Sequence, residues 1–185
     1  MENDEYIDII NADGSATGKS CLKSEIHSKG YYHNTAHVWF YNANAKILLA
    51  QRAASKTIYP LLWDVSVAGH VDAGENIKHA AIRETREEIG IEIPESNLEK
   101  IGVYDCFQSY ANDIKDNEFH HTFIAKIDYT LEDFILDKEE VAQVKFVSIP
   151  EFRELLENSD LNGHFISSNT PYYLEVIHAI ERRLS

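Results

Sequence analysis

Alternating hydrophobic and polar residues predict short β-strands in the first part of the chain. Residues 6–10 alternate in this way and end at a turn-like segment, residues 11–14. Residues 36–41 and 46–51 are rich in apolar side chains and flank an Asn-Ala-Asn-Ala turn, so we expect them to form a hairpin. A further short strand is expected over residues 64–68.

The pattern becomes helical over residues 76–89. The segment has strong helix formers, no proline and no internal glycine, and Gly90 follows at the position where helices commonly end. At about 100° per residue, a stripe suited to packing on a sheet lies beside a stripe of carboxylates. The packing stripe consists of Ala81, Ile82, Thr85 and Ile89. We therefore expect a helix with a core face and an acidic face side by side.

Strand-like and helix-like segments continue through the rest of the chain. Three more strands are expected, over residues 101–110, 119–128 and 141–149, with the polar residues 111–118 between the first two. Two late helices are expected, over residues 150–158 and 172–184. Strands on both sides of a central helix indicate an α/β sandwich with a mixed sheet. We expect one globular domain over residues 31–185, with residues 1–30 as a strand-and-turn extension packed on it.

Composition and charge restrict the class of protein. The 185 residues are 44% hydrophobic and 26% charged, which is ordinary for one globular domain and argues against disorder. Asp and Glu number 31 against 17 Lys and Arg, so the formal net charge is -14. A chain this acidic is poorly suited to nucleic acid or to an anionic membrane, because both are polyanions. We expect neither as a partner, and binding of a phosphorylated substrate needs a local explanation.

Cysteine content and the absence of targeting signals indicate a cytoplasmic protein. Cys21 and Cys106 cannot build a disulfide framework, which leaves two reduced thiols or one disulfide open. The first residues, MENDEYIDII, begin with acids and lack the basic and apolar regions of a signal peptide. No apolar run approaches the ~20 residues that a membrane helix needs.

The predicted helix and the loop before it carry the most chemistry. Glu84, Glu87 and Glu88 share a wedge of roughly 100° on an ideal helix, so their charges repel one another. A divalent cation such as Mg²⁺, which prefers carboxylate oxygens, removes that repulsion. Arg83 is placed to hold one carboxylate, and Gly69 permits a tight loop whose backbone oxygens approach a metal. The alternative is a solvated acidic helix face.

The spacing of these residues resembles the Nudix box. Gly-x5-Glu-x7-Arg-Glu-x2-Glu-Glu-x-Gly matches from Gly69 to Gly90, although Thr85 stands where the family usually has an aliphatic residue. The resemblance implies a Nudix-type α/β/α sandwich and hydrolysis of a diphosphate linkage with Mg²⁺ or Mn²⁺. It also implies a set of metal ligands, namely the Gly69 carbonyl, Glu84, Glu87 and Glu88. By the same resemblance, Arg83 orients the carboxylates and Glu84 is one candidate for the base that activates water.

Beyond the box the chain resembles the isopentenyl-diphosphate isomerases. Residues 39–42, 52–56 and 60–70 carry this likeness, which implies that Arg52 and Lys56 hold the diphosphate. The isomerases have a catalytic cysteine where this chain has Ala68, and neither of its two cysteines aligns with that position. They also lack the hydrolase acids that this chain keeps. A hydrolase of isomerase-like build is therefore favoured over an isomerase.

The isomerase resemblance also implies a second metal site. Its ligands would be His33, His70, Asp116 and Glu118, a set suited to Mn²⁺ or Zn²⁺. His27 lies near another ligand position but one residue out of register. The alternative is that these are ordinary surface or hydrogen-bonded histidines, because nine are scattered along the chain.

Two further groups of residues have open roles. Glu139 and Glu140 fall where several Nudix enzymes place an additional acid, which serves as base or ligand; a charged strand edge is the alternative. Four aromatic side chains are candidates for stacking on a nucleobase or for the core, namely Tyr59, Trp63, Tyr104 and Phe107.

The sequence thus predicts a metal-dependent hydrolase of a nucleoside diphosphate derivative or related small diphosphate. An isomerase, disfavoured by Ala68, and a non-catalytic diphosphate sensor, disfavoured by the full set of acids, stay open as alternatives. Dimers are common in the family, so a homodimer is one expectation.

Overall fold

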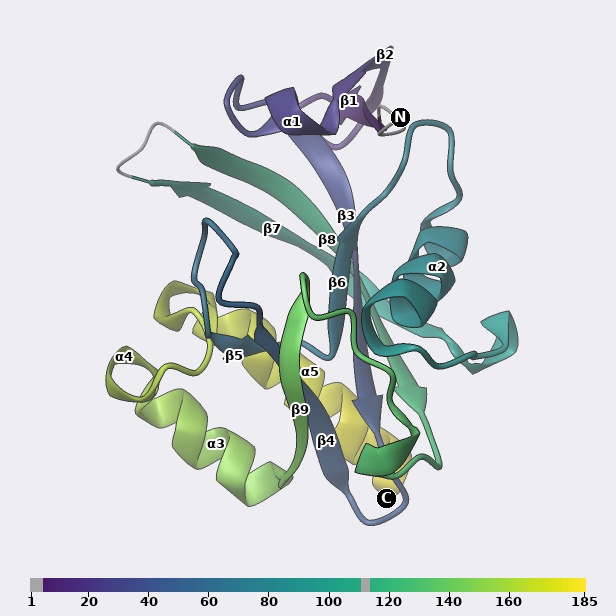
Figure 1. Ribbon diagram of the computed structural model, residues 1–185, viewed down its shortest axis with the longest axis vertical. Helices are drawn as coiled ribbons and strands as arrows, with labels where there is room; N and C mark the ends of the chain where they lie inside the picture. Colours follow the sequence, from purple (N-terminus) through teal and green to yellow (C-terminus); the bar gives the residue numbers. More distant parts are fainter. Residues whose placement is uncertain (1–4, 111–113) are drawn as a thin grey trace.

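Nine strands form one mixed sheet in the described part of the chain, residues 5–110 and 114–185 of a computed structural model (Figure 1). The strands are β1 (Tyr6–Ile10), β2 (Ala16–Leu22), β3 (Tyr32–Tyr41), β4 (Lys46–Arg52), β5 (Trp63–Asp64), β6 (Val67–His70), β7 (Glu99–Ser109), β8 (Lys115–Lys126) and β9 (Val141–Ser148). The helices are α1 (Lys23–Ile26), α2 (Ile77–Ile89), α3 (Ile149–Glu157), α4 (Ser159–Asn162) and α5 (Thr170–Leu184), with 3-10 turns at Glu95–Asn97, Leu131–Asp133 and Ser167–Asn169. The central helix and both late helices lie within two residues of their expected bounds.

Strand β3 runs through the middle of the sheet. It pairs in parallel with β8, from Tyr32 opposite Asn117 to Tyr41 opposite Lys126, and antiparallel with β6. Its one described pairing with β4 lies beside the turn, at Tyr41 opposite Ile47. The hairpin expected from the sequence is therefore present at its turn, but its described pairing does not extend along the two strands. The hairpin stays short because β6 pairs with β3 from Thr35 to Val38, and β4 also pairs along its length with β9.

Helices cover both faces of the sheet, which confirms the predicted α/β/α sandwich (Figure 1). On one face, α2 packs over a core that includes Ala36, Val38 and Phe40 of β3. On the other face, α3 and α5 pack over a core that includes Trp39 and Tyr41. Alternate residues of β3 thus enter opposite cores, because successive side chains of a strand point to opposite faces.

Residues 5–30 form a small unit at one end of β3. β1 and β2 pair antiparallel, and Ile10 of β1 lies opposite Tyr32 of β3. Their apolar contacts form a small core of Ile7, Cys21 and Ile26. The hydrophobic pattern does not predict β2, because this strand is mostly polar and exposed. The unit ends beside His27, which α1 places next to His70 of β6.

Strand β8 begins earlier than the sequence pattern indicates. Its first residue is Lys115 rather than residue 119, so Asp116 and Glu118 lie on a strand instead of in a loop. Residues 111–113 of the expected polar segment lie outside the described residues. The early start places Glu118 opposite His33 of β3 and Asp116 opposite Gln108 of β7.

The strand expected over residues 64–68 is interrupted at Val65 and Ser66. The Asp64 carboxylate accepts a hydrogen bond from the Val65 amide at 2.8 Å, and the buried Ser66 hydroxyl donates to the Leu48 carbonyl at 2.6 Å. Because side chains satisfy the backbone here, β5 and β6 pair with different strands, β4 and β3.

The structure also bears on the expected state of the two cysteines and on the question of a membrane-spanning helix. Cys21 on β2 and Cys106 on β7 are both free and buried, so the two reduced thiols are present rather than a disulfide. Among the described residues, each helix is too short or too polar to cross a bilayer.

Candidate active site

Helix α2 carries the predicted acidic cluster. It begins after Asn76, whose side chain accepts the Lys78 amide at 2.9 Å, and ends at Gly90 in the left-handed conformation with φ 73°. On its buried face, the Thr85 hydroxyl donates to the Ala81 carbonyl at 2.6 Å. The one departure from the expected box pattern therefore leaves no unpaired hydroxyl at that position.

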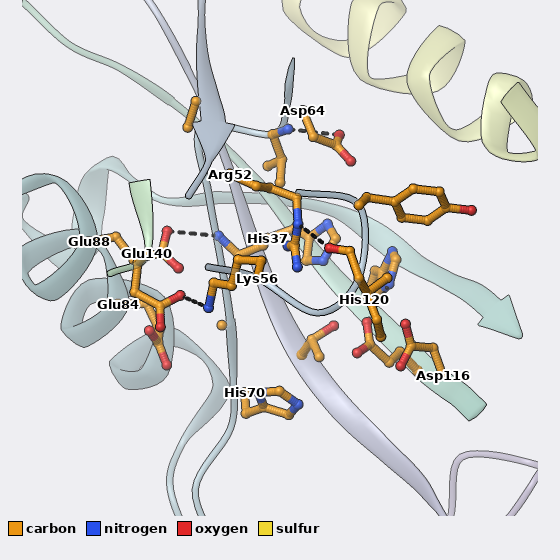
Figure 2. Close-up of a pocket in the computed structure, with 18 of the residues that line it drawn as sticks. His37, Arg52, Lys56, Asp64, His70, Glu84, Glu88, Asp116, His120 and Glu140 are labelled. Carbon is orange, nitrogen blue, oxygen red and sulfur yellow. Dashed lines mark hydrogen bonds and ion pairs between the residues drawn. The ribbon is translucent and has the colours of Figure 1, made fainter. Parts of the chain in front are cut away.

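The three carboxylates of α2 lie in the wall of a cavity of about 430 Å³ (Figure 2). Glu84 and Glu88 are buried, and Glu87 is half exposed. Burial, with the nearby charges of Glu84 and Glu140, raises the pKa of Glu88 well above its ordinary value. Burial also raises the pKa of Glu84, against the opposing charge of Arg83. The electrostatic repulsion expected from the sequence therefore acts mainly between Glu84 and Glu88, which are both buried.

Arg83 ties the loop before α2 to the acids on the helix. Its Nε and Nη2 atoms donate to the Glu75 carboxylate at 3.0 and 2.8 Å, and Nη2 also donates to the His70 carbonyl at 3.0 Å. Its Nη1 atom donates to Glu84 at 2.7 Å and to Glu87 at 3.1 Å. The guanidinium of Arg83 therefore fixes the loop before α2 relative to the acids of the helix. A lysine side chain cannot form the same set of hydrogen bonds.

Gly69 approaches α2 so closely that a side chain does not fit. A Cβ atom at Gly69 would overlap the carboxyl group of Glu84. Pairing of β6 with β3 holds the Gly69 backbone opposite Ala36, and the amide of Ala68 donates to Glu88 Oε2 at 3.3 Å. The β6 backbone and both buried acids therefore lie together, where the sequence placed its metal ligands.

Arg52, Lys56 and Glu140 line the same cavity, and Figure 2 shows Lys56 directed toward Glu140. Lys56 forms an ion pair with Glu140. Arg52 Nε donates to the Ile58 carbonyl at 2.9 Å, and no ion pair is found for Arg52 among the described residues. Glu139 is exposed and does not line the cavity. Two basic side chains and one further acid therefore face the α2 carboxylates.

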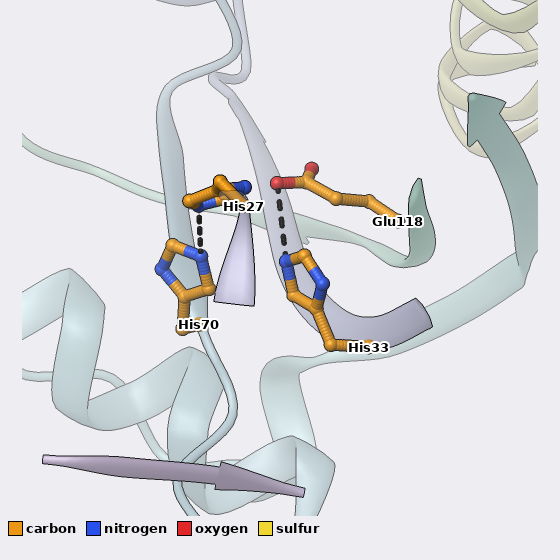
Figure 3. A group of neighbouring side chains, drawn as sticks. All are labelled: His27, His33, His70 and Glu118. Carbon is orange, nitrogen blue, oxygen red and sulfur yellow. Dashed lines mark hydrogen bonds and ion pairs between the residues drawn. The ribbon is translucent and has the colours of Figure 1, made fainter. Parts of the chain in front are cut away.

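Four potential metal ligands from separate elements lie close to one another (Figure 3). They are His27 after α1, His33 of β3, His70 of β6 and Glu118 of β8. One ligand atom of each lies within 4.8 Å of the others. The Nε2 atoms of His27 and His70 are 3.1 Å apart, and Glu118 Oε1 lies 3.5 Å from His33 Nε2. Burial lowers the pKa of His70 to about 3, which keeps its ring neutral, as a metal ligand requires.

Asp116 lies one step behind this group rather than in it. Its Oδ1 atom is 2.8 Å from His27 Nδ1, and its Oδ2 atom accepts a hydrogen bond from the Tyr110 hydroxyl at 3.0 Å. The isomerase resemblance placed His27 one residue out of register with a ligand position. In the structure, His27 takes the place in the ligand group that was expected for Asp116. A carboxylate on the far nitrogen of a histidine commonly orients the ring toward a metal.

The floor of the cavity contains polar residues that the sequence did not reveal. Thr35 and His37 line it from β3, and the same face of the strand becomes apolar at Trp39. From β8, His120 stacks on His37 with ring centroids 3.9 Å apart, and its Nε2 atom lies 2.9 Å from Glu118 Oε2. The signal that could have revealed them is polar residues spaced two apart along a predicted strand.

Of the four aromatic side chains considered for stacking, Tyr59 lines the cavity and the other three do not. Trp63, Tyr104 and Phe107 pack against other aromatic rings instead. Tyr59 is partly exposed and contacts the edge of Tyr110. Among these four, Tyr59 is therefore the candidate that has access to a bound molecule.

Comparisons with known proteins show the family of the chain. The family model described as the NUDIX domain matches residues 31–167. The chain belongs to the Nudix family. It is 38% identical over 162 residues to Nudix hydrolase 3 of Arabidopsis thaliana, a match that covers 85% of this chain but 21% of that protein. It is 32% identical over 165 residues to an uncharacterized Nudix hydrolase of Clostridium acetobutylicum, covering 88% of this chain and 78% of the relative.

Isomerases are also among the relatives of this Nudix protein. It is 30% identical over 156 residues to isopentenyl-diphosphate Delta-isomerase 2 of Photorhabdus laumondii, covering 84% of each chain. The named Nudix hydrolases support a hydrolase with pyrophosphohydrolase activity in general. The chain spans about a fifth of the length of the Arabidopsis relative, so the activity of that whole protein is not transferred.

Solved structures share the Nudix fold at low identity. DR0079 of Deinococcus radiodurans has a TM-score of 0.67 at 18% identity, covering 96% of this chain and 98% of the other. The NUDIX domain of Shewanella oneidensis NrtR, solved in complex with ADP-ribose, has a TM-score of 0.58 at 17% identity, covering 82% and 88%. These likenesses concern the fold alone.

The Nudix acids of this chain fit a divalent cation. The Glu88 carboxylate is buried, and its hydrogen bonding within the described residues is limited to the Ala68 amide. An ionised carboxylate with so little compensation is costly, and either protonation, which the raised pKa of Glu88 favours, or a bound cation removes that cost. Mg²⁺ and Mn²⁺ are hard ions that take oxygen ligands of this kind.

Proposed function

We propose that this Nudix protein hydrolyses a diphosphate linkage in a nucleoside diphosphate derivative or a related small diphosphate compound, using Mg²⁺ or Mn²⁺. The observation that carries the proposal is the pair of buried acids, Glu84 and Glu88, packed beside Gly69 in a cavity that also contains Arg52 and Lys56. Without a cation such a pair is unfavourable, whereas with one it forms a site for phosphate oxygens. The net charge of -14 is then no obstacle to an anionic substrate.

The proposed roles divide between metal, substrate and orientation. The metal ligands are the Gly69 carbonyl and the carboxylates of Glu84, Glu87 and Glu88. A bound cation neutralises the diphosphate and lowers the pKa of the attacking water. Arg83 positions the acids through its five hydrogen bonds. Arg52 and Lys56 bind the diphosphate oxygens.

The chemical step is attack of water on one phosphorus atom. The water oxygen forms a new bond to phosphorus, the bridging P–O bond breaks, and the water proton passes to a carboxylate. Glu84 and Glu140 are the two candidates for this base. In the free protein Lys56 is paired with Glu140. We infer that a substrate phosphate draws Lys56 away, which leaves Glu140 able to accept a proton.

A panel of diphosphate compounds tests this function. Product formation is followed by chromatography with Mg²⁺ and Mn²⁺ on nucleoside diphosphates, ADP-ribose, sugar nucleotides and isopentenyl diphosphate. The terminal diphosphates release inorganic phosphate, whereas ADP-ribose and sugar nucleotides give two phosphomonoesters. Glu84→Gln and Glu88→Gln should each lower turnover of the best substrate about 100-fold or more, because each removes an anionic ligand. Glu92→Gln, an exposed acid just beyond α2, is the matched control. Near-native turnover in either site variant would show that the site is assigned wrongly.

We also propose that His27, His33, His70 and Glu118 bind a second metal ion, Mn²⁺ or Zn²⁺. Support comes from the four convergent ligand atoms and from Asp116 behind His27. Chelated protein is reloaded with either metal, and bound ions are counted. His70→Ala should lose one ion that the Glu84→Gln/Glu88→Gln double variant keeps. An ion count that His70→Ala leaves unchanged would remove this second site.

The same assays separate the two alternatives. An isomerase is disfavoured because Ala68 supplies no acid on β6. Formation of dimethylallyl diphosphate from isopentenyl diphosphate would nevertheless establish it. Tight binding of a panel member without release of product would instead identify a diphosphate sensor.

A further inference from the structure

The face of β3 that points into the cavity changes character at His37. Thr35 and His37 line the cavity, whereas Trp39, the next residue on the same face, is buried in the core beneath α5. Tyr172, from the first turn of α5, contacts both sides of this boundary. His37 is therefore the last polar residue before the core, at the floor of the substrate cavity.

A chain of hydrogen bonds fixes the orientation of hydrogen atoms at this boundary. Trp39 Nε1 donates to the Tyr172 hydroxyl oxygen at 2.8 Å, and an indole nitrogen can only donate. The single hydrogen of the Thr122 hydroxyl has a nearer acceptor, the His120 carbonyl at 3.2 Å, and the Thr122 oxygen lies 3.4 Å from the phenol oxygen. Of the two neighbours that can accept the phenol hydrogen, His37 Nδ1 at 3.0 Å is nearer than Thr122 Oγ1 at 3.4 Å, so we assign this hydrogen to His37 Nδ1.

The consequence is a defined tautomer of His37. Because Nδ1 accepts a hydrogen bond, the ring hydrogen of the neutral imidazole lies on Nε2. No described residue accepts a hydrogen bond from His37 Nε2. The nearby Thr35 hydroxyl, 3% exposed, likewise has no partner among the described residues. Two residues on one strand face thus offer donors to the cavity, and the protein does not satisfy them.

We propose that His37 and Thr35 form a subsite for an oxygen-bearing organic group on the diphosphate, such as the hydroxyl or carbonyl groups of a sugar or nucleoside. The subsite rests on the proposed hydrolase function and specifies which substrates that function takes. Acceptor oxygens on the organic group satisfy these donors. A hydrocarbon group in the same place leaves them buried and unpaired, which lowers the specificity constant by about tenfold to a hundredfold for each donor.

This subsite separates the chain from a prenyl-diphosphate enzyme. A hydrocarbon tail gains by contact with apolar walls, whereas this floor presents imidazole and hydroxyl groups from two adjacent strands. His120 adds a third polar group, since its ring stacks on His37 and turns Nε2 toward Glu118. Selectivity for polar over hydrocarbon groups therefore resides in β3 and β8, outside the Nudix helix.

The experiment compares specificity constants for ADP-ribose, ADP and isopentenyl diphosphate. ADP and isopentenyl diphosphate are both terminal diphosphate esters, so they differ in the organic group alone. His37→Leu removes the donor, and His37→Gln returns an amide near the position of Nε2. Tyr172→Phe keeps the aromatic ring but removes the hydroxyl that donates to His37 Nδ1, so either ring nitrogen of His37 can then carry the hydrogen. His178→Leu, an exposed histidine on α5, is the matched control for the change in chemistry. Thermal melts establish that each variant is folded.

We expect the ratio of the polar to the hydrocarbon specificity constant to fall about tenfold to a hundredfold in His37→Leu. It should recover in part in His37→Gln and stay at the wild-type value in His178→Leu. A ratio that His37→Leu leaves unchanged, or a wild-type preference for isopentenyl diphosphate, would overturn the subsite. So would loss of a bound Mn²⁺ ion in His37→Leu without a change in the ratio, because His37 would then be a metal ligand with His120 and Glu118.

A binding measurement distinguishes failure of the subsite from failure of the hydrolase. Dissociation constants for the same compounds are determined by calorimetry with Ca²⁺ in place of Mg²⁺. If no compound is hydrolysed but the polar compounds bind more tightly in a manner that depends on His37, the hydrolase proposal fails and the subsite stands. Binding that does not discriminate between the compounds, or no binding at all, would overturn the subsite.

Discussion

Replacing Arg83 by Gln removes the guanidinium that joins the loop before α2 to the acids on the helix. Arg83 makes five hydrogen bonds, to Glu75, Glu84, Glu87 and the His70 carbonyl. A glutamine amide has two N–H groups and no charge, so it can replace few of these bonds and neutralise none of the acids. In the absence of metal, the acids would then repel one another without a counter-ion.

The cost can be worked out from the exposure of the partners. Removing one member of a buried ion pair costs about 3–5 kcal/mol. Here the side chains of Arg83, Glu75 and Glu84 are 23%, 18% and 12% exposed, and Glu87, at 51%, adds little. Because water reaches the edge of this group, we expect a loss of about 2–3 kcal/mol in the free energy of unfolding. Turnover should fall about 100-fold, since the acids lose their fixed orientation.

Urea unfolding in EDTA and in Mg²⁺ measures the effect on stability. Arg86→Gln, three residues further along α2 and exposed, is the matched control and should change the free energy of unfolding by less than about 0.5 kcal/mol. The difference between the two variants should shrink in Mg²⁺, because a cation takes over part of the neutralisation. Arg83→Lys should be intermediate, since it keeps the charge but not the planar fork.

Two results would refute this reasoning. Equal stability of the Arg83→Gln and Arg86→Gln variants in EDTA would show that the hydrogen bonds of Arg83 contribute no net stability. A loss of stability accompanied by wild-type turnover would show that the acids keep their arrangement without Arg83.

Two further substitutions test the packing of the buried acids. Gly69→Ala places a methyl group where the Glu84 carboxyl lies, so turnover in a steady-state assay should fall about 100-fold or more, and native turnover would contradict the close approach. Glu88→Gln removes a buried charge, so in EDTA at pH 8 it should raise the free energy of unfolding by about 1–3 kcal/mol, whereas Mg²⁺ should reverse the order. Because the folded-state pKa of Glu88 is raised above its ordinary value of 4.5, the wild type is penalised as pH rises above 4.5 and not below it. The advantage of Gln in thermal melts should therefore grow with pH, and an advantage that is largest at acid pH would contradict the assignment.

The Nudix acids could be predicted because a helix converts sequence spacing into an angle. Glu84 and Glu88 are four residues apart and share a face, and the structure buries both. The same local logic gives the helix end at Gly90 and the packing role of Thr85. The burial of the acids was not predictable from spacing, because it depends on how closely Gly69 of another element approaches.

The polar floor and the histidine group could be predicted in part at most. The parallel register of β3 and β8 sets His33 opposite Glu118 and Thr35 opposite His120. Register between strands distant in sequence is decided by the whole sheet, and a shift of one residue would turn every one of these side chains to the other face. The resemblance supplied His33 and Glu118 but had no means of identifying Thr35 or His120.

The position of His27 links metal binding at the amino-terminal strands to the stability of the folded chain. It precedes the family-matched residues 31–167, and it lies 91 residues (118 − 27) from Glu118. A cation held by both side chains would act as a reversible cross-link that closes this long loop and restricts the unfolded chain, as a disulfide does. Docking of the amino-terminal unit and capture of metal would then be one cooperative event. Metal supply would govern how long the chain stays folded as well as how fast it turns over.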